Sequence, residues 1–77
     1  MHIINIFGST GYIGEKTLKI IHKYFPQIKI NLLLANKNYK KISKQAKLYK
    51  SKYVCLTDDS KYLLLQNELK NTKIKII

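Results

Sequence analysis

Three glycines give this 77-residue sequence its clearest chemical signal, because they are its only glycines and they share one loop. The loop reads Gly8-Ser9-Thr10-Gly11-Tyr12-Ile13-Gly14 and directly follows an apolar run. At this spacing Gly8 permits a sharp turn, Gly11 lets an anion approach the backbone, and Gly14 permits close packing of the next element. The loop therefore predicts a cradle for the phosphates of a dinucleotide, formed by helix N–H groups and by the hydroxyls of Ser9 and Thr10. The alternative is a tight turn without a ligand.

The second informative stretch is Ala35-Asn36-Lys37-Asn38, which ends the second apolar run. Sites specific for NAD usually carry an acid about 20 residues after the glycines, where it binds the ribose 2′-hydroxyl. None of the four acids of this chain lies there. A cation flanked by amides suits a 2′-phosphate instead, so the stretch predicts NADP(H) as the cofactor. The alternative is that Lys37, one of fifteen lysines, stands there by chance.

No other residues suggest catalysis or metal binding. His2 and His22 are far from any nucleophile, and the adjacent Asp58 and Asp59 are typical of a turn rather than of a metal site. Cys55 has no basic neighbour in the sequence and is predicted to be a small buried hydrophobe. We therefore predict no catalytic and no metal-binding residue in this chain.

Alternating strands and helices are predicted to position the loop. Strands are expected at residues 3–7, 28–35, 53–56 and 73–77, and helices at 12–25, at 39–49 and from a cap at Asp59 or Ser60 to about residue 69. Pro26 is expected to end the first helix, and the apolar residues 3–7 predict a strand buried on both faces. The order β-α-β-α-β-α-β predicts an α/β fold with a parallel, partial Rossmann-like sheet.

The net charge of +11 comes from lysine alone, since arginine is absent. One interpretation is a surface that attracts phosphates or nucleic acid. The other, which we favour, is AT-rich codon usage, because base and phosphate recognition usually relies on the planar fork of arginine. We expect weak, salt-sensitive binding of polyanions and no specific nucleic-acid partner.

Composition also bears on location. No apolar run approaches the roughly 20 residues of a membrane span, and the N-terminus lacks the features of a secretory signal. The single cysteine excludes a disulfide framework and fits a reducing compartment. We expect a cytoplasmic protein without a membrane partner.

Taken in order, these motifs resemble the N-terminal part of the 1-deoxy-D-xylulose 5-phosphate reductoisomerase family. The loop of that family reads G-S-T-G-S-I-G, and the helix after it carries a T-L-x-[IV]-I run, matched here by residues 17–21. Its second strand ends in alanine and a Gly-Lys/Arg-Asn stretch, matched by residues 35–38. An E-Q-x-x-[EK]-[FY] run and a P-[KE]-Y-[VA] run correspond to residues 44–49 and 51–54. The resemblance covers essentially the whole chain.

The resemblance implies roles for particular residues. Thr10, Gly11, Tyr12 and Ile13 should line the pyrophosphate and adenosine side of NADPH, and Asn36, Lys37 and Asn38 should meet the 2′-phosphate and the adenine ribose. Two residues depart from the family pattern. Tyr12 replaces a serine and is expected to contact the cofactor through its backbone N–H, and Asn36 replaces a glycine at a turn that asparagine tolerates.

The family uses NADPH and a divalent metal, Mg²⁺ or Mn²⁺, to make 2-C-methyl-D-erythritol 4-phosphate in the non-mevalonate isoprenoid pathway, and it is expected to act as a homodimer. Its metal and substrate residues lie past position 77. We therefore expect residues 1–77 to form an incomplete NADP-binding domain, the N-terminal part of a longer enzyme, which is not catalytic alone. The alternatives are another NADP-dependent reductase, a basic nucleic-acid-binding module, half of a split enzyme, or a decayed gene product.

Overall fold

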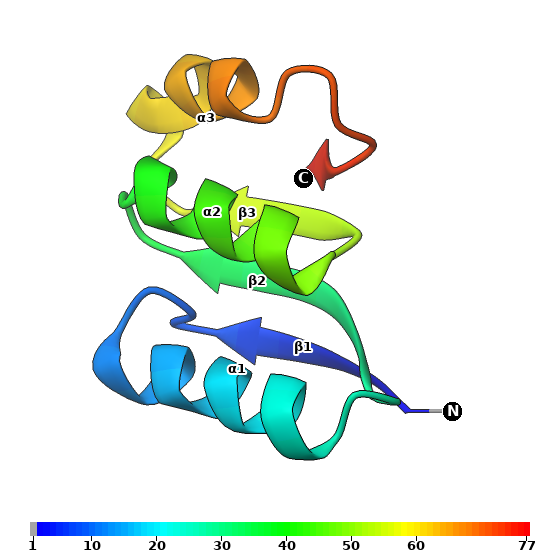
Figure 1. Cartoon of the computed structure of the whole chain (residues 1–77). Helices are drawn as coiled ribbons and strands as arrows, with labels where there is room; N and C mark the ends of the chain where they lie inside the picture. Colours follow the sequence, from blue (N-terminus) through cyan, green and yellow to red (C-terminus); the bar gives the residue numbers. More distant parts are fainter. Residues whose placement is uncertain (1) are drawn as a thin grey trace.

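The computed structural model describes residues 2–77, in which strands and helices alternate strictly (Figure 1). The strands are β1 (Ile3–Phe7), β2 (Lys29–Ala35), β3 (Tyr53–Leu56) and β4 (Lys75–Ile76). The helices are α1 (Tyr12–Tyr24), α2 (Tyr39–Tyr49) and α3 (Tyr62–Glu68), with a short 3₁₀ turn, η1 (Asp59–Lys61), before α3. This order confirms the predicted β-α-β-α-β-α-β arrangement.

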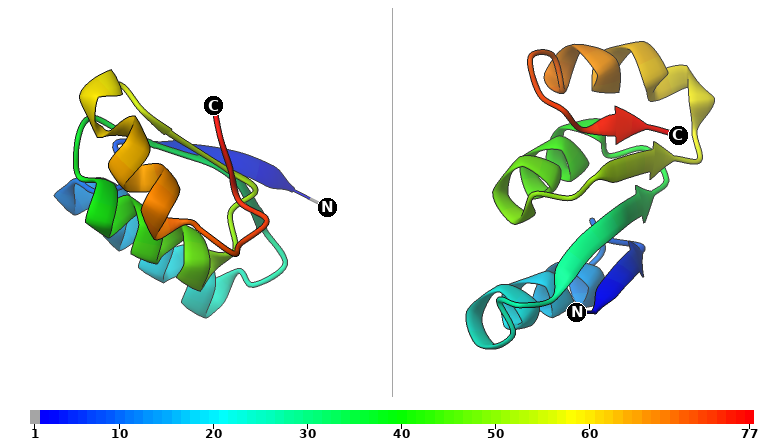
Figure 2. Two further views of the ribbon diagram at one scale, coloured as in Figure 1. Left: turned by 90° about the horizontal axis from the view of Figure 1, so that it is seen from above. Right: turned by 90° about the vertical axis from the view of Figure 1, so that its right-hand side faces the viewer.

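All four strands are parallel and lie side by side in the order β1-β2-β3-β4. A β-bulge between Ile4 and Asn5 shifts the register with β2, after which Ile6 pairs with Leu33 and Leu33 pairs with Val54. Each right-handed crossover adds its strand on the same side of the previous one. In both views of Figure 2, α1 and α2 lie on one face of the sheet, and α3 lies at the end of the sheet that carries β3 and β4.

The core lies between that face of the sheet and the helices. Leu18 of α1, Leu33 of β2, Ile42 of α2, Val54 of β3 and Leu65 of α3 are completely buried there. Each of these five elements therefore contributes at least one fully buried aliphatic side chain to a common cluster. None of the helices within residues 2–77 is long and apolar enough to cross a lipid bilayer.

Among residues 2–77 no helix covers the opposite face of the sheet, which corrects the expectation that β1 is buried on both faces. Ile6 points to the helices and is buried, whereas Ile3 and Phe7 are 64% and 69% exposed. Period and register place nine side chains on this side, which we call the open face: Ile3, Asn5, Phe7, Lys29, Leu32, Leu34, Tyr53, Cys55 and Lys75. Cys55 is accordingly half-buried rather than buried as predicted.

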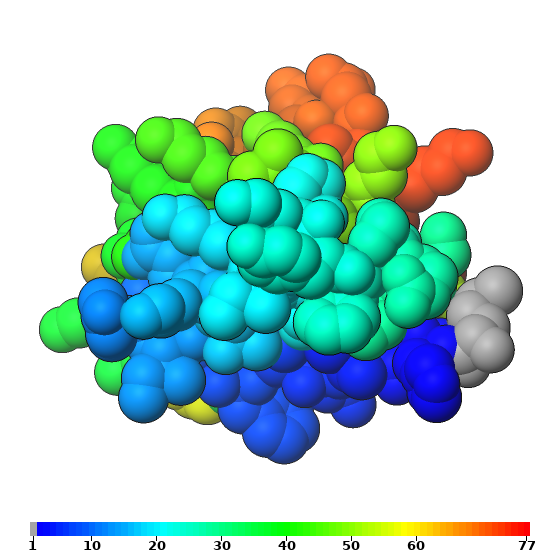
Figure 3. All heavy atoms as spheres, turned by 60° about the horizontal axis from the view of Figure 1, so that its bottom comes forward, coloured from blue at the N-terminus to red at the C-terminus, as the bar shows by residue number. Residues whose placement is uncertain are grey.

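β1 is also an edge strand, because it stands at the end of the strand order. In Figure 3 the dark blue atoms of β1 form the lower margin of the molecule beneath α1, and no other segment lies beyond them in that view. The hydrogen-bonding groups on the outer side of β1 are therefore open to another strand.

Several element boundaries differ from the predictions. α1 ends at Tyr24, one residue early, where the Phe25 N–H donates to the carbonyl of Ile21 at 2.8 Å. The predicted third helix is capped by neither Asp59 nor Ser60. Asp58 accepts hydrogen bonds from the Ser60 N–H (3.0 Å) and hydroxyl (2.6 Å), and this cap starts η1 ahead of α3. β4 is limited to two residues of the predicted residues 73–77.

Candidate functional site

The glycine loop leaves the carboxyl end of β1 and is fixed at once to the neighbouring strand. The N–H groups of Gly8 and Ser9 both donate to the Leu34 carbonyl, at 2.7 and 3.1 Å. Gly8 has a φ of +73°, which confirms that the sharp turn needs a residue without a Cβ. The Gly11 N–H then donates to the Gly8 carbonyl at 3.0 Å and closes a tight turn.

Gly14, in the first turn of α1, is where the helix meets the loop most closely. A Cβ built at Gly14 would run into the Gly8 carbonyl oxygen and would lie 2.8 Å from the Ser9 Cα. The contact confirms the predicted close packing, although α1 packs here on the loop rather than on the strand itself. At Gly11 a Cβ would lie 3.4 Å from the Gly8 oxygen, so its absence leaves the outer surface of the loop open.

The N-terminal end of α1 presents hydrogen-bond donors to solvent. Within residues 2–77 the N–H groups of Thr10, Tyr12 and Ile13 have no acceptor in the protein, and no side chain caps the helix. These donors stand at the positive end of the helix dipole. The loop therefore has the features of an anion-binding site.

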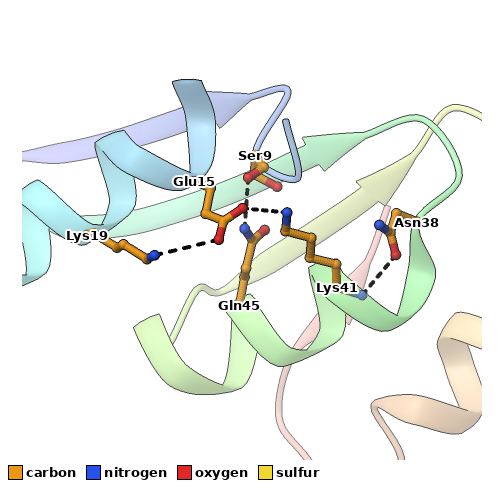
Figure 4. Close-up of polar contacts among 6 residues, drawn as sticks. All are labelled: Ser9, Glu15, Lys19, Asn38, Lys41 and Gln45. Carbon is orange, nitrogen blue, oxygen red and sulfur yellow. Dashed lines mark hydrogen bonds and ion pairs between the residues drawn. The ribbon is translucent and has the colours of Figure 1, made fainter. Parts of the chain in front are cut away.

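Ser9 and Thr10 differ in what they offer such an anion. Thr10 is partly exposed, but Ser9 is completely buried and its hydroxyl has no partner among the described residues. The hydroxyl of Ser9 is therefore not at the surface where a phosphate would lie. The Ser9 carbonyl instead accepts a hydrogen bond of 2.8 Å from Nε2 of Gln45, a contact from α2 that the sequence interpretation missed (Figure 4).

Asn36, Lys37 and Asn38 follow β2 at the same edge of the sheet as the glycine loop, because β1 and β2 are parallel neighbours. The Asn36 Oδ1 accepts from the Thr57 hydroxyl at 2.8 Å, and the Asn38 Oδ1 caps α2 by accepting from the Lys41 N–H at 3.1 Å. Asn36 does not adopt a positive φ, so its turn does not depend on the left-handed region.

Lys37 is the one charged side chain of this stretch, and it is exposed. Over the described part of the chain it forms no ion pair and no side-chain hydrogen bond. The structure thus brings a cation to the same sheet edge as the glycine loop, while both flanking asparagines are engaged with the protein through their side-chain oxygens.

Charges around the loop favour an anion. Glu15, in the first turn of α1, forms ion pairs with Lys41 and, at 3.7 Å, with Lys19 (Figure 4). The hydrogen bond and charge of Lys41 are the main causes that lower the pKa of Glu15. Hydrogen bonds from Ser60 likewise lower the pKa of Asp58, with smaller effects of Lys61 and Lys37. Glu15, the acid beside the loop, is therefore ionised at neutral pH and paired with two lysines, whereas Asp58 is stabilised as a carboxylate mainly by Ser60.

The described residues do not suit a metal ion. No group of three or more His, Cys, Asp or Glu side chains within residues 2–77 lies close enough together to hold one. His22 lies in the last turn of α1 with its ring edge-on to Tyr49, at 5.4 Å between ring centroids. Asp58 and Asp59 belong to the η1 turn, as predicted.

The parallel sheet with a glycine loop at the carboxyl end of its first strand defines the class of this protein as a Rossmann-like α/β unit. The sequence model of one family, described as 1-deoxy-D-xylulose 5-phosphate reductoisomerase, matches residues 4–77. The chain belongs to the 1-deoxy-D-xylulose 5-phosphate reductoisomerase family, which confirms the resemblance seen in its motifs.

Curated relatives carry the same name. The 1-deoxy-D-xylulose 5-phosphate reductoisomerase of Pelagibacter ubique (strain HTCC1062) is 50% identical to this chain over 76 residues, and that of Porphyromonas gingivalis (strain W83) is 41% identical over 73 residues. The two matches cover 99% and 95% of this chain but 20% and 19% of the relatives. The chain thus spans a fifth of the length of the curated relatives it matches.

Solved structures agree on the fold. The chain matches 1-deoxy-D-xylulose 5-phosphate reductoisomerase from Zymomonas mobilis in complex with NADPH, with a TM-score of 0.93 and 28% identity, over 97% of this chain and 20% of that one. A second match, with a TM-score of 0.90 and 23% identity, is a DOX-P reductoisomerase in complex with NADPH, fosmidomycin and magnesium. At that identity the second match speaks to the fold alone.

Proposed function

We propose that this chain forms the NADPH-binding segment of a 1-deoxy-D-xylulose 5-phosphate reductoisomerase. The observation that carries the proposal is the loop itself. Its free N–H groups gather at the start of α1, and the glycine at position 14 lets the helix approach so closely that a Cβ would not fit. The Zymomonas mobilis relative, with its nearly superimposable fold, is in complex with NADPH.

Each part of the loop has its own task in this proposal. The N–H groups of Thr10, Tyr12 and Ile13 donate to the pyrophosphate, and Gly8 and Gly11 keep the backbone turned and uncovered. Ser9 shapes the loop rather than contacting the cofactor, because its side chain is buried, its N–H bonds to the Leu34 carbonyl and its carbonyl accepts from Gln45.

The 2′-phosphate of the cofactor is assigned to the end of β2. Lys37 supplies the cation, and the Nδ2 groups of Asn36 and Asn38 remain as donors, because the bonds made by both amides use their oxygens. An acid at this position would repel the phosphate, and none is present in the stretch from 35 to 38.

The wider activity is proposed from the family. NADPH would supply hydride in the reductoisomerase reaction of the non-mevalonate pathway, and the segment described here would bind and orient that cofactor. The divalent metal of the family does not fit residues 2–77, so we assign it no ligand here. We further propose that the enzyme acts in the cytoplasm as a homodimer.

Calorimetric titration with NADPH and with NADH tests the cofactor assignment. Replacing Lys37 by alanine removes a charge-assisted contact, which is typically worth a loss of about 10- to 100-fold in affinity. We expect that loss for NADPH and little change for NADH. Lys70→Ala, at an exposed lysine after α3, is the matched control.

Two results would contradict the assignment. Equal affinity for NADPH and NADH would contradict the proposal that Lys37 binds the 2′-phosphate. Equal losses in Lys37→Ala and Lys70→Ala, with a steep dependence on salt, would instead support a basic module that binds polyanions without selecting the cofactor.

A further inference from the structure

Gln45 is one of two buried polar residues on α2, and the other, Ser43, bonds within its own helix to the Lys40 carbonyl. Only 7% of Gln45 is exposed. Its Nε2 donates to the Ser9 carbonyl at 2.8 Å, across 36 residues of sequence (Figure 4). Within the described residues it is the one side-chain hydrogen bond made to the loop of residues 8–14.

Burial of this amide has a cost that an apolar residue would avoid. The Oε1 of Gln45 and the hydroxyl of Ser9 are both buried, and neither has a partner within residues 2–77. Unsatisfied buried polar groups destabilise a fold. Nε2 of Gln45 nevertheless makes the one hydrogen bond that the Ser9 carbonyl accepts within residues 2–77, so the glutamine serves the loop rather than the packing of the core.

The hydrogen bond fixes the direction of one peptide group in the loop. The peptide between Ser9 and Thr10 is trans, since residues 2–77 hold no cis bond, so its C=O and N–H point to opposite sides. Gln45 holds the carbonyl toward α2. The Thr10 N–H is therefore turned away from α2, toward the partly exposed outer side of the loop.

We propose that Gln45 is a positioning residue for the dinucleotide: it holds the Ser9–Thr10 peptide so that the Thr10 N–H faces the pyrophosphate. The inference rests on the proposed function and assigns Gln45 no contact with the cofactor. Without the glutamine the peptide is free to rotate, and the loop must be ordered when the phosphate binds. That ordering lowers affinity while the fold persists.

Two variants separate positioning from packing. Gln45→Met keeps the length of the side chain but has no donor. Gln45→Glu places a carboxylate against the Ser9 carbonyl at about pH 8, and its protonated form regains an O–H donor as the pH falls toward about 5.5, because burial raises the pKa of a carboxyl group. NADP⁺ serves as the probe, since it withstands acid better than NADPH.

We expect Gln45→Met to weaken NADP⁺ binding by about 3- to 10-fold at every pH, the usual effect of one neutral hydrogen bond. Gln45→Glu should bind weakly at about pH 8 and approach the affinity of the unaltered chain near pH 5.5. Dividing each affinity by that of the unaltered chain at the same pH removes the titration of the cofactor phosphates. Parallel losses in both variants at all pH values would overturn the proposal.

Amide hydrogen exchange without cofactor tests the restraint independently of what the chain binds. In Gln45→Met we expect faster exchange at Ser9 and Gly11, whose N–H groups are hydrogen-bonded in the loop, and unchanged exchange at Val54 in the core, as a loosened loop in an intact fold would show. Unchanged exchange at Ser9 and Gly11 overturns the restraint. A chain that shows the exchange effect but binds no NADP⁺ would instead contradict the proposed function and leave the restraint of the loop supported.

Discussion

At the scale of single residues, the most constrained position is Gly14. A methyl group there would meet the carbonyl of Gly8 and the Cα of Ser9, which are backbone atoms held by hydrogen bonds to β2. We expect Gly14→Ala to destabilise the fold by about 1–3 kcal/mol, as overpacking usually does, and to abolish cofactor binding. Chemical denaturation measures the first effect and titration with NADPH the second.

Gly11→Ala is the matched control for that substitution. A Cβ at Gly11 would lie 3.4 Å from the Gly8 oxygen, and its φ of −77° suits any residue. We expect a change in stability within about 0.5 kcal/mol, the usual range for an undemanding site. Equal losses of stability in Gly11→Ala and Gly14→Ala would show that the loop tolerates a side chain at neither position. The close approach at Gly14 would then not be the specific cause.

Glu15 makes stability depend on pH. Its pKa is lowered below the ordinary 4.5, chiefly by the hydrogen bond and charge of Lys41, so the folded chain favours the ionised form. A lowered pKa contributes stability that is present above the ordinary value and is lost as the pH falls through the folded pKa. We expect Glu15→Gln to lower the melting temperature at neutral pH and to match the unaltered chain well below pH 4.5.

Salt and a second variant control the measurement. The ion pairs of Glu15 are exposed to solvent, so high salt should reduce the difference. Glu68→Gln alters a carboxylate that makes no ion pair within residues 2–77 and should lack this pH profile. A difference between Glu15→Gln and the unaltered chain that persists at low pH would mean that packing, not charge, is responsible.

Local and long-range residues differed in how well the sequence predicted them. The conformations of Gly8 and Gly14 follow from three glycines at fixed spacing, which are local facts. The contact of Gln45 with Ser9 joins residues 36 apart, and nothing in either segment alone signals it. The burial of the Ser9 hydroxyl was missed for the same reason, since it depends on how α2 lies over the loop.

At the scale of elements, α3 depends on its neighbour. It has seven residues, too few to be stable alone, and it packs against α2 through the fully buried Leu65. We expect Leu65→Ala to lower the free energy of unfolding by about 2–5 kcal/mol, as large-to-small changes in cores do. Leu63→Ala, at a position 74% exposed on the same helix, should stay within about 0.5 kcal/mol of the unaltered chain.

Denaturation followed by two probes tests whether α3 unfolds with the rest. If circular dichroism and hydrogen exchange at Val54 respond equally to Leu65→Ala, α3 belongs to one cooperative unit. A loss confined to residues 59–77 would contradict that expectation and would mark α3 and β4 as a separately unfolding segment.

Element types were predictable because hydrophobic periodicity is strong over residues 3–56. The boundaries of helices and strands were less predictable where short-range hydrogen bonds determine them. Asp58, rather than Asp59 or Ser60, starts the turn before α3, since its carboxylate reaches both the N–H and the hydroxyl of Ser60. β4 pairs only where Lys75 and Ile76 meet β3, although the apolar pattern extends further.

At the scale of the whole molecule, strand order decides what is exposed. Apolar strands predict burial on both faces, but they do not reveal that every crossover proceeds in one direction. Dinucleotide sites of this class lie where the strand order reverses. Within residues 2–77 the order does not reverse, and β1 remains an edge, so the described chain provides one side of such a crevice.

The open face and the net charge act in opposite directions on self-association. The chain has a net charge of +11 and a radius of gyration of 11.6 Å. The electrostatic screening length is about 10 Å at 0.1 M salt and longer at lower salt, so the charges of two neighbouring copies act on each other over a distance similar to the size of the chain. Copies therefore repel at low salt. At 1 M salt the screening length falls to about 3 Å, and the apolar face should then bring copies together.

We expect sedimentation to show monomers at low salt and association at 1 M salt. We expect the double variant Phe7→Thr, Leu34→Thr to stay monomeric at 1 M salt. These two residues pair across β1 and β2 on the open face, and threonine preserves strand propensity. Leu63→Gln, at a residue as exposed as Phe7 but on α3, is the control and should associate like the unaltered chain. If Leu63→Gln also prevents association, or if salt does not change the association, copies of the chain do not associate through the open face. If the double variant alone stays monomeric at 1 M salt, the uncovered side of the sheet is the surface that meets a second copy, because there the exposed Phe7 lies beside the half-buried Leu34 of the adjacent strand.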